Sequence, residues 1–171
     1  PPSESGYYDF GTTEWEDVEA AVQYALDHGA KKIVLVGFSM GGGVVINYQL
    51  KSKLAEHTVG IVLDSPMLDF GRTVDKGAEE RGVPAPITFA AKIFSTWRFG
   101  IDWDELDFLS KSKEIKVPVL VFHGDADETV PIETSYVFAG ANPDTVAMFT
   151  FEGVGHVASW NWYPIRYRSL V

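Results

Sequence analysis

The chain has 171 residues, of which 46% are hydrophobic and 22% charged, and its formal net charge is −10. This composition indicates a globular domain and excludes a disordered chain, and no apolar run is long enough for a transmembrane helix. The acidic balance argues against nucleic-acid binding, and the absence of cysteine excludes disulfides and thiol catalysis. No secretory signal is in view, but this absence says little about location, so the cytoplasm is favoured and the compartment stays open.

The first predicted element is a helix over residues 14–28, after a loop at residues 1–11. The segment Thr13-Glu14-Trp15-Glu16 reads as a capping box at the start of this helix, apolar residues recur on one helical face, and Gly29 ends it. A short β-branched run then predicts a strand at 33–36.

The most informative stretch follows this strand. Gly37-Phe38-Ser39-Met40-Gly41 is a Gly-x-Ser-x-Gly turn that leads directly into a predicted helix at 40–56. Such a tight strand-to-helix turn lifts the serine hydroxyl out of the sheet, and Gly37 and Gly41 are expected to supply the steric clearance. We therefore expect Ser39 to be a nucleophile and the Met40 N–H, at the start of the helix, to stabilise an oxyanion.

Downstream segments continue an alternation of strand and helix. We predict strands at 60–63, 117–122 and 146–151, a helix at 132–140, and the first turns of a last helix at 164–171. This order predicts an α/β fold with a mostly parallel sheet, helices on both faces, and a single domain over 1–171. The segment 71–113 interrupts the alternation as a long insertion.

Two polar loops follow the later strands. His123-Gly124-Asp125-Ala126-Asp127-Glu128 comes after the third predicted strand, and Gly153-Val154-Gly155-His156 comes after the fourth. A serine needs an imidazole to accept its proton, and the imidazole needs a carboxylate to orient it. Because the carboxyl ends of parallel strands meet at one edge, these loops can converge on the serine.

The choice of acid stays open at this point. Asp127 is favoured by its spacing from His123-Gly124, whereas Asp125 is expected to bond local backbone as a turn residue. Glu128 competes in the same loop, and Asp64, at the end of another strand, is a rival. His123 is expected to hold the acid loop by a hydrogen bond, and the remaining histidines, at helix ends, read as solvated.

These motifs resemble the α/β-hydrolase superfamily, in its branch of esterases, acyl-peptidases and lysophospholipase-like enzymes. The resemblance implies Ser39 as nucleophile, His156 as general base and acid, and Asp127 as the orienting acid. It also implies that the insertion 71–113 forms a cap over the active site. No cofactor or metal is implied, and the substrate would be a small acyl compound, namely an ester, thioester or peptide.

The family pattern contains strands before the nucleophile strand, and one of their loops supplies a second oxyanion donor. Here the chain reads as beginning in the middle of the domain, with one sheet edge uncovered. We therefore expect self-association, or a missing N-terminal segment, to complete the sheet. Without the second donor, turnover should fall by on the order of 10² to 10³, which predicts a weakly active or inactive chain.

Aromatic residues are candidates for the substrate pocket. The insertion is rich in them, and Trp160 and Trp162 follow His156. The predicted substrate-binding residues are Phe38, Phe94, Trp97 and Trp160. The alternative for each is ordinary packing, which is the usual role of buried aromatic side chains.

Three other interpretations fit parts of the sequence. A glycine-rich turn followed by Asp64 resembles a dinucleotide-binding unit, but the second glycine of that motif is replaced by Ser39. A metal site could use His123, Asp125, Asp127 and His156, although this spacing matches no ligand motif. The chain could also be a non-catalytic remnant of the fold that binds a partner.

Overall fold

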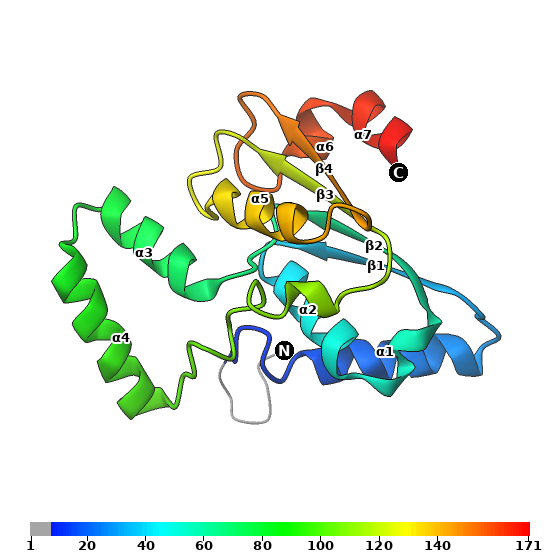
Figure 1. Ribbon diagram of the computed structural model, residues 1–171, viewed down its shortest axis with the longest axis horizontal. Helices are drawn as coiled ribbons and strands as arrows, with labels where there is room; N and C mark the ends of the chain where they lie inside the picture. Colours follow the sequence, from blue (N-terminus) through cyan, green and yellow to red (C-terminus); the bar gives the residue numbers. More distant parts are fainter. Residues whose placement is uncertain (1–7) are drawn as a thin grey trace.

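The computed structural model describes residues 8–171 and contains a parallel sheet of four strands (Figure 1). The strands lie side by side in chain order and are β1 (Ile33–Phe38), β2 (Thr58–Asp64), β3 (Val119–Gly124) and β4 (Val146–Phe151). The predicted α/β class is confirmed. All strands point the same way, so their carboxyl ends form one edge of the sheet. Of the predicted loop at 1–11, residues 1–7 lie outside the described part.

Helices cover both faces of the sheet, as predicted. One face packs against α2 (Met40–Lys51) and α5 (Ile132–Ala141), and α1 (Trp15–Asp27) packs on α2. The other face is covered by α7 (Pro164–Leu170), which follows the short α6 (Ser159–Trp162). Within the described residues, no helix is long and apolar enough to cross a membrane.

The buried core explains why the strands read as continuous apolar runs. Successive side chains of a strand alternate between the two faces. Val119 and Val121 face α2 and α5 and are at most 1% exposed, whereas Phe122 points to the opposite face and packs on Tyr167 of α7. Because both faces of β2 and β3 are covered, their sequences show little polar alternation.

The predicted helix at 40–56 is too long by its last five residues. Helix α2 ends at Lys51, because Ser52 adopts an extended backbone (φ −78°, ψ 139°). The Ser52 hydroxyl accepts a hydrogen bond from the Leu54 N–H at 3.0 Å and begins a 3-10 helix, Lys53–His57. A serine that caps a new turn is consistent with the preference of this side chain for helix starts.

The predicted capping box is also wrong. Helix α1 begins at Trp15, and Glu14 is the residue before it. The two Glu14 carboxylate oxygens instead accept hydrogen bonds from the N–H groups of Asp9 and Gly11, at 2.8 and 2.7 Å. Glu14 therefore organises the loop before the helix rather than the first helical turn.

Strand β1 lies at one edge of the sheet, and its face away from α2 is exposed within the described residues. The side chains of Val34, Val36 and Phe38 point away from α2 and are 59%, 51% and 48% exposed. An exposed apolar strand edge can pair with another strand. Association of this edge with a second copy or a further segment stays a prediction.

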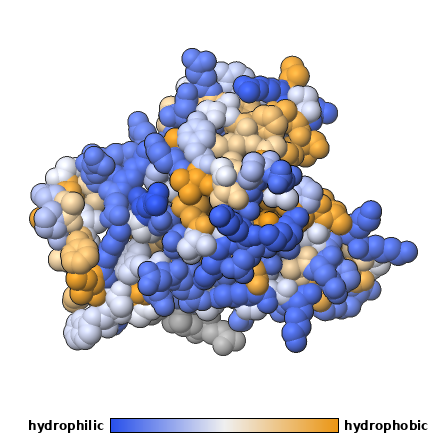
Figure 2. Space-filling model, in the orientation of Figure 1, coloured by the Kyte–Doolittle hydropathy of each residue, from blue (hydrophilic) through white to orange (hydrophobic). Residues whose placement is uncertain are grey.

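The insertion contains α3 (Phe70–Glu80) and α4 (Ala85–Phe99), which pack on each other and project from the sheet (Figure 1). Lys92 joins them, because its Nζ lies 2.7 Å from an Asp75 carboxylate oxygen and donates to the Gly71 carbonyl at 2.8 Å. Apolar side chains remain on the outer surface of α4 (Figure 2). The role of this segment as a cap stays a prediction.

Close packing of α2 on the sheet depends on glycines, but not on the pair expected from the sequence. A Cβ atom at Gly37 would lie 2.7 Å from the Gly41 carbonyl oxygen, so this clearance is needed, whereas a Cβ at Gly41 would meet nothing within 4 Å. The second tight position is Gly42, where a Cβ would lie 2.5 Å from Pro66 Cβ, and the third is Gly43, which faces Met67 and Phe108.

This difference gives a matched pair of variants. Gly37→Ala should lower the free energy of unfolding by roughly 1–3 kcal/mol, because its methyl group collides with backbone atoms. Gly41→Ala should be neutral or stabilising by up to about 1 kcal/mol, since alanine favours the helix that contains this residue. Urea denaturation of both variants measures the difference, and equal stabilities would contradict the packing described here.

Candidate active site

Ser39 occupies the predicted turn between β1 and α2. Its backbone adopts φ 50° and ψ −123°, a region that non-glycine residues rarely occupy. Its N–H donates to the Asp64 carbonyl at 3.1 Å, and its own carbonyl accepts from the N–H groups of Gly42 and Met67, each at 2.9 Å. Backbone bonds to α2 and to the loop after β2 therefore hold this strained turn.

The three residues predicted from the loops converge at this turn. His156 Nε2 lies 2.9 Å from Ser39 Oγ, and His156 Nδ1 lies 2.8 Å from Asp127 Oδ2 and 3.1 Å from Asp127 Oδ1. We call this arrangement the Ser–His–Asp triad. Its members follow β1, β4 and β3, and residues 117 positions apart meet because these strands end at the same edge.

The Asp127 carboxylate is buried and held by several donors. Its Oδ1 accepts hydrogen bonds from the N–H groups of Thr129 and Val130, each at 2.9 Å, and its Oδ2 lies 3.1 Å from His123 Nε2. Burial alone raises the pKa of this carboxyl, but the contacts with His123, His156 and the two backbone N–H groups outweigh burial and hold the pKa well below its usual range. Asp127 is therefore ionised and can orient the imidazole.

His123 lies against the acid loop, as the sequence predicts. Its ring is fully buried, with Nδ1 2.8 Å from Ser135 Oγ on α5 and Nε2 beside Asp127. The Nε2 group approaches the carboxylate off the line of a well-formed hydrogen bond. The predicted hydrogen bond from His123 to the acid loop is therefore not well formed, and the buried ring supports this loop chiefly by packing.

Asp125 has a different role from the local turn contact expected for it. Its carboxylate accepts a hydrogen bond from the Gly153 N–H at 2.6 Å, across 28 residues of sequence. The bond ties the loop that carries Asp127 to the loop that carries His156. Glu128, the other candidate of this loop, is exposed.

Asp64, the rival acid, is buried beside the triad but bonds elsewhere. Its Oδ1 accepts a hydrogen bond from Ser159 Oγ at 3.2 Å, whereas the imidazole of His156 bonds Asp127 and Ser39. Burial raises the pKa of the Asp64 carboxyl to about 6, which the Ser159 hydrogen bond only partly offsets. The structure therefore places Asp127, and not Asp64, at the imidazole.

Met40 is the first residue of α2 and follows Ser39 directly. N–H groups in the first turn of a helix have no intrahelical acceptor, and the helix dipole places partial positive charge there. The position suits an oxyanion donor, and this role stays a prediction.

The four aromatic residues predicted to bind substrate lie in three separate places. Phe38 is on the exposed face of β1, and Phe94 and Trp97 are 55% and 79% exposed on α4, with ring centroids 5.8 Å apart. Trp160 contacts Tyr167 edge to face at 5.5 Å, so it packs against α7. A substrate-binding role for these residues stays a prediction.

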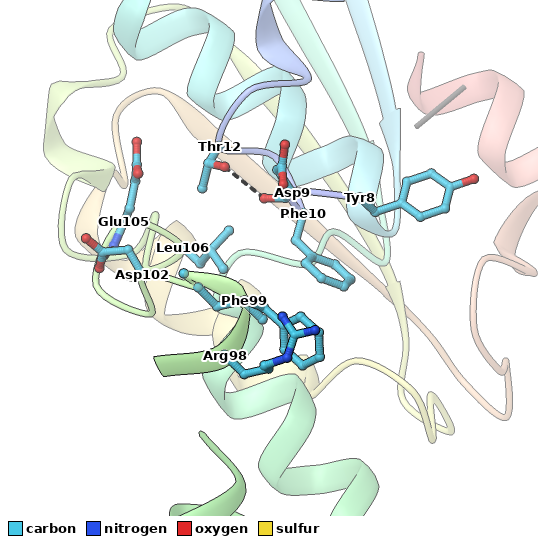
Figure 3. A pocket seen from close by; sticks show the side chains of 11 residues that line it. Tyr8, Asp9, Phe10, Thr12, Arg98, Phe99, Asp102, Glu105 and Leu106 are labelled. Carbon is cyan, nitrogen blue, oxygen red and sulfur yellow. Dashed lines mark hydrogen bonds between the residues drawn. The ribbon is translucent and has the colours of Figure 1, made fainter. Parts of the chain in front are cut away.

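A cavity of about 520 Å³ lies between the N-terminal loop and the end of α4 (Figure 3). Phe10 and Leu106 face it from one side, and Arg98 and Phe99 from the α4 side. None of the triad residues lines this cavity. Among residues 8–171, no group of three or more acidic or histidine side chains is arranged to hold a metal ion.

Sequence reasoning missed the contacts that hydroxyl and carboxylate side chains make between loops. Ser65 is fully buried, and its Oγ accepts a hydrogen bond from the Val157 N–H at 3.2 Å. No local pattern indicates this contact, which joins residues 92 positions apart. Its one sequence signal is the position of Ser65 directly after a strand that ends at the same edge.

A parallel α/β sheet with a serine on a strained strand-to-helix turn defines the architecture of α/β hydrolases. The model of the alpha/beta hydrolase family matches residues 2–168, so the chain belongs to this family. The dinucleotide-binding interpretation explains neither this match nor the loops of Asp127 and His156.

Solved structures share the fold. The chain superposes on an esterase from Pyrococcus furiosus with a TM-score of 0.71 and 24% identity, over 94% of this chain and 60% of that chain. The superposition on a puromycin-hydrolyzing peptidase from Mycobacterium tuberculosis has a TM-score of 0.65 and 22% identity, over 86% of this chain and 23% of that chain. For a monoacylglycerol lipase from Paleococcus ferrophilus the TM-score is 0.62 and the identity is 19%, over 94% of this chain and 74% of that chain. The chain thus spans about three fifths of the length of the Pyrococcus esterase.

Proposed function

We propose that the chain carries the catalytic machinery of a serine hydrolase that cleaves an ester or related acyl bond. The observation that carries this proposal is the continuous set of contacts from Ser39 Oγ to His156 Nε2 and from His156 Nδ1 to Asp127. These distances are within the range needed for proton transfer and for orientation of the imidazole.

The proposed reaction has two halves. The Ser39 oxygen attacks the acyl carbon while its proton passes to His156 Nε2, and the proton then goes to the leaving group as the acyl–oxygen bond to that group breaks. Water next attacks the acyl-enzyme, gives its proton to His156, and the Ser39 hydroxyl is restored as the acid leaves. Asp127 keeps Nδ1 protonated and stabilises the imidazolium in both halves.

The oxyanion of each tetrahedral intermediate would be bound by the Met40 N–H. Family members use a second donor from a loop before the nucleophile strand, and we assign no second donor within this chain. Loss of one donor costs on the order of 10² to 10³ in turnover, so we propose that the isolated chain is a slow catalyst. A chain that matches a complete homologue in rate would contradict this proposal.

The proposed substrate class is a small carboxylic ester, with a thioester or peptide as alternatives. The similar structures are an esterase, a peptidase and a monoacylglycerol lipase, names that all concern acyl bonds and support this class. We further propose that the insertion 71–113 acts as the cap, because it lies in the same connection, between β2 and β3, that leads out of the site. Its aromatic side chains would then contact the acyl group.

A fluorophosphonate probe tests the proposal directly. Such a probe reacts with an activated serine, so mass spectrometry after tryptic digestion should find the adduct on the peptide that contains Ser39. Labelling should stop when the protein is unfolded in urea, because the imidazole is then lost. A folded chain that remains unlabelled would support the alternative, a non-catalytic form of the fold that binds a partner.

A further inference from the structure

Three strained backbone positions gather at the triad. In the described part of the chain, four non-glycine residues have positive φ, and three of these follow strands that end at the site: Ser39 (50°), Ser65 (48°) and Val157 (52°). Each such conformation is energetically unfavourable and persists only where the surrounding structure enforces it. For the β-branched Val157 this conformation is especially unusual.

The loop after β2 holds the backbone of Ser39 from both sides. The Asp64 carbonyl accepts the Ser39 N–H at 3.1 Å, and the Met67 N–H donates to the Ser39 carbonyl at 2.9 Å. Between them, Pro66 fills the space that Gly42 leaves open on α2. The position of the nucleophile is therefore set by the residues that flank Ser65.

Ser65 itself reaches the opposite side of the site. Its N–H donates to the Phe122 carbonyl at 2.9 Å, which fixes its backbone to the end of β3, and its side chain is fully buried. Its hydroxyl oxygen accepts the N–H of Val157, the residue after His156, at 3.2 Å. One short loop thus contacts both the turn that carries Ser39 and the loop that carries His156.

We propose that Ser65 is a positioning residue whose hydroxyl holds the strained Val157 backbone and thereby keeps the His156 imidazole within reach of Ser39 Oγ. This inference rests on the proposed hydrolase function. Ser65 does not act on the substrate. It sets the 2.9 Å distance between His156 Nε2 and Ser39 Oγ through the peptide bond that joins His156 to Val157.

Removal of the hydroxyl should affect rate more than stability or affinity. The substitution removes a single hydrogen bond, at the partly exposed Val157, so the fold should survive. The imidazole, however, is no longer held, and a displacement of about 1 Å in such a group can cost about 100-fold in rate. We expect kcat to fall by roughly 10- to 100-fold and KM to change by less than about 2-fold.

Two variants separate the hydroxyl from the backbone strain. Ser65→Ala and Ser65→Gly both delete the hydroxyl, but glycine also relieves the cost of positive φ. The control is Ser112→Ala, because Ser112 is a buried serine in the 3-10 helix Ser112–Glu114, before β3 and at the opposite edge of the sheet. Steady-state hydrolysis of 4-nitrophenyl acetate gives kcat and KM, and urea denaturation gives the stability of each variant.

The proposal requires both Ser65 variants to lose kcat while KM and the control remain near wild type. It also requires the fluorophosphonate labelling rate of Ser39 to fall in parallel. A Ser65→Gly variant as active as wild type would overturn it, and so would equal losses in Ser112→Ala. Failure of both Ser65 variants to fold would also overturn it, because Ser65 would then be a structural residue.

The outcome for the wild-type chain keeps this inference distinct from the proposed function. If the wild-type chain is not labelled at Ser39, the hydrolase proposal fails first. If the wild-type chain is labelled and the Ser65 variants react at the same rate, only the positioning role fails. The downfield proton resonance of a hydrogen-bonded imidazole Nδ1–H offers a second readout, and it should shift in Ser65→Ala.

Discussion

Ser39→Ala should abolish 4-nitrophenyl ester hydrolysis, with a loss on the order of 10⁴- to 10⁶-fold limited by the rate of the wild-type chain. The variant lacks Ser39 Oγ, which is the only protein atom that forms a covalent bond to the acyl group in the proposed mechanism. His156 and Asp127 remain, but without a nucleophile they cannot form an acyl-enzyme. Stopped-flow measurement of nitrophenolate release should show a burst in the wild-type chain and none in the variant.

The fold should survive this substitution, which keeps its interpretation clear. The Ser39 backbone bonds to Asp64, Gly42 and Met67 do not involve the hydroxyl. Alanine does lack the short polar side chain that tolerates positive φ, so a stability loss of about 1 kcal/mol is expected. A variant that is folded by circular dichroism and hydrolyses the ester at the wild-type rate would exclude Ser39 as the nucleophile.

Asp127→Asn should lower kcat by about 10⁴-fold, provided that the loop keeps its geometry. An amide in place of the carboxylate can donate a hydrogen bond to Nδ1, which favours the wrong tautomer and leaves no acceptor charge for the imidazolium. The Thr129 and Val130 N–H groups can still bond the remaining amide oxygen. The site should therefore be present but poorly oriented.

The matched control is Glu128→Gln, which removes a carboxylate from the next residue of the same loop. Glu128 is exposed, so the Glu128→Gln variant should keep a kcat within about 2-fold of wild type and a free energy of unfolding within about 0.5 kcal/mol of wild type. Steady-state kinetics from pH 6 to 9 would compare the two variants. Similar losses in both, or a mild effect of Asp127→Asn alone, would argue against Asp127 as the orienting acid.

Sequence reasoning reached the site where chemistry imposes a local backbone requirement. A nucleophilic serine needs a tight strand-to-helix turn, and the residues around Ser39 show both the turn and its flanking elements. Loops after two later strands supplied a carboxylate and an imidazole, and the spacing from His123-Gly124 favoured Asp127 over its rivals. These predictions depended on short segments whose conformation is dictated by their own residues.

The errors arose where contacts between distant segments decide the structure. Gly41 looked essential within its motif, but the atoms that approach α2 come from Pro66 and Met67, outside that motif. Asp125 looked like a turn residue, but its carboxylate accepts a hydrogen bond from the Gly153 N–H on another loop. The end of α2 at Ser52 likewise depends on a side-chain bond to the next turn. A single sequence contains no signal that pairs these positions.

The order of the strands has a consequence for synthesis in the cell. Because β1 through β4 lie side by side in chain order, the growing polypeptide can add each of these strands beside the one made before it. The His156 imidazole, which lies 2.9 Å from the Ser39 hydroxyl, is translated 117 residues later. A ribosome-bound intermediate therefore already carries Ser39 but has no base beside it. Under the proposed mechanism, Ser39 would stay unactivated until the segment that carries His156 has been made and has docked on the sheet.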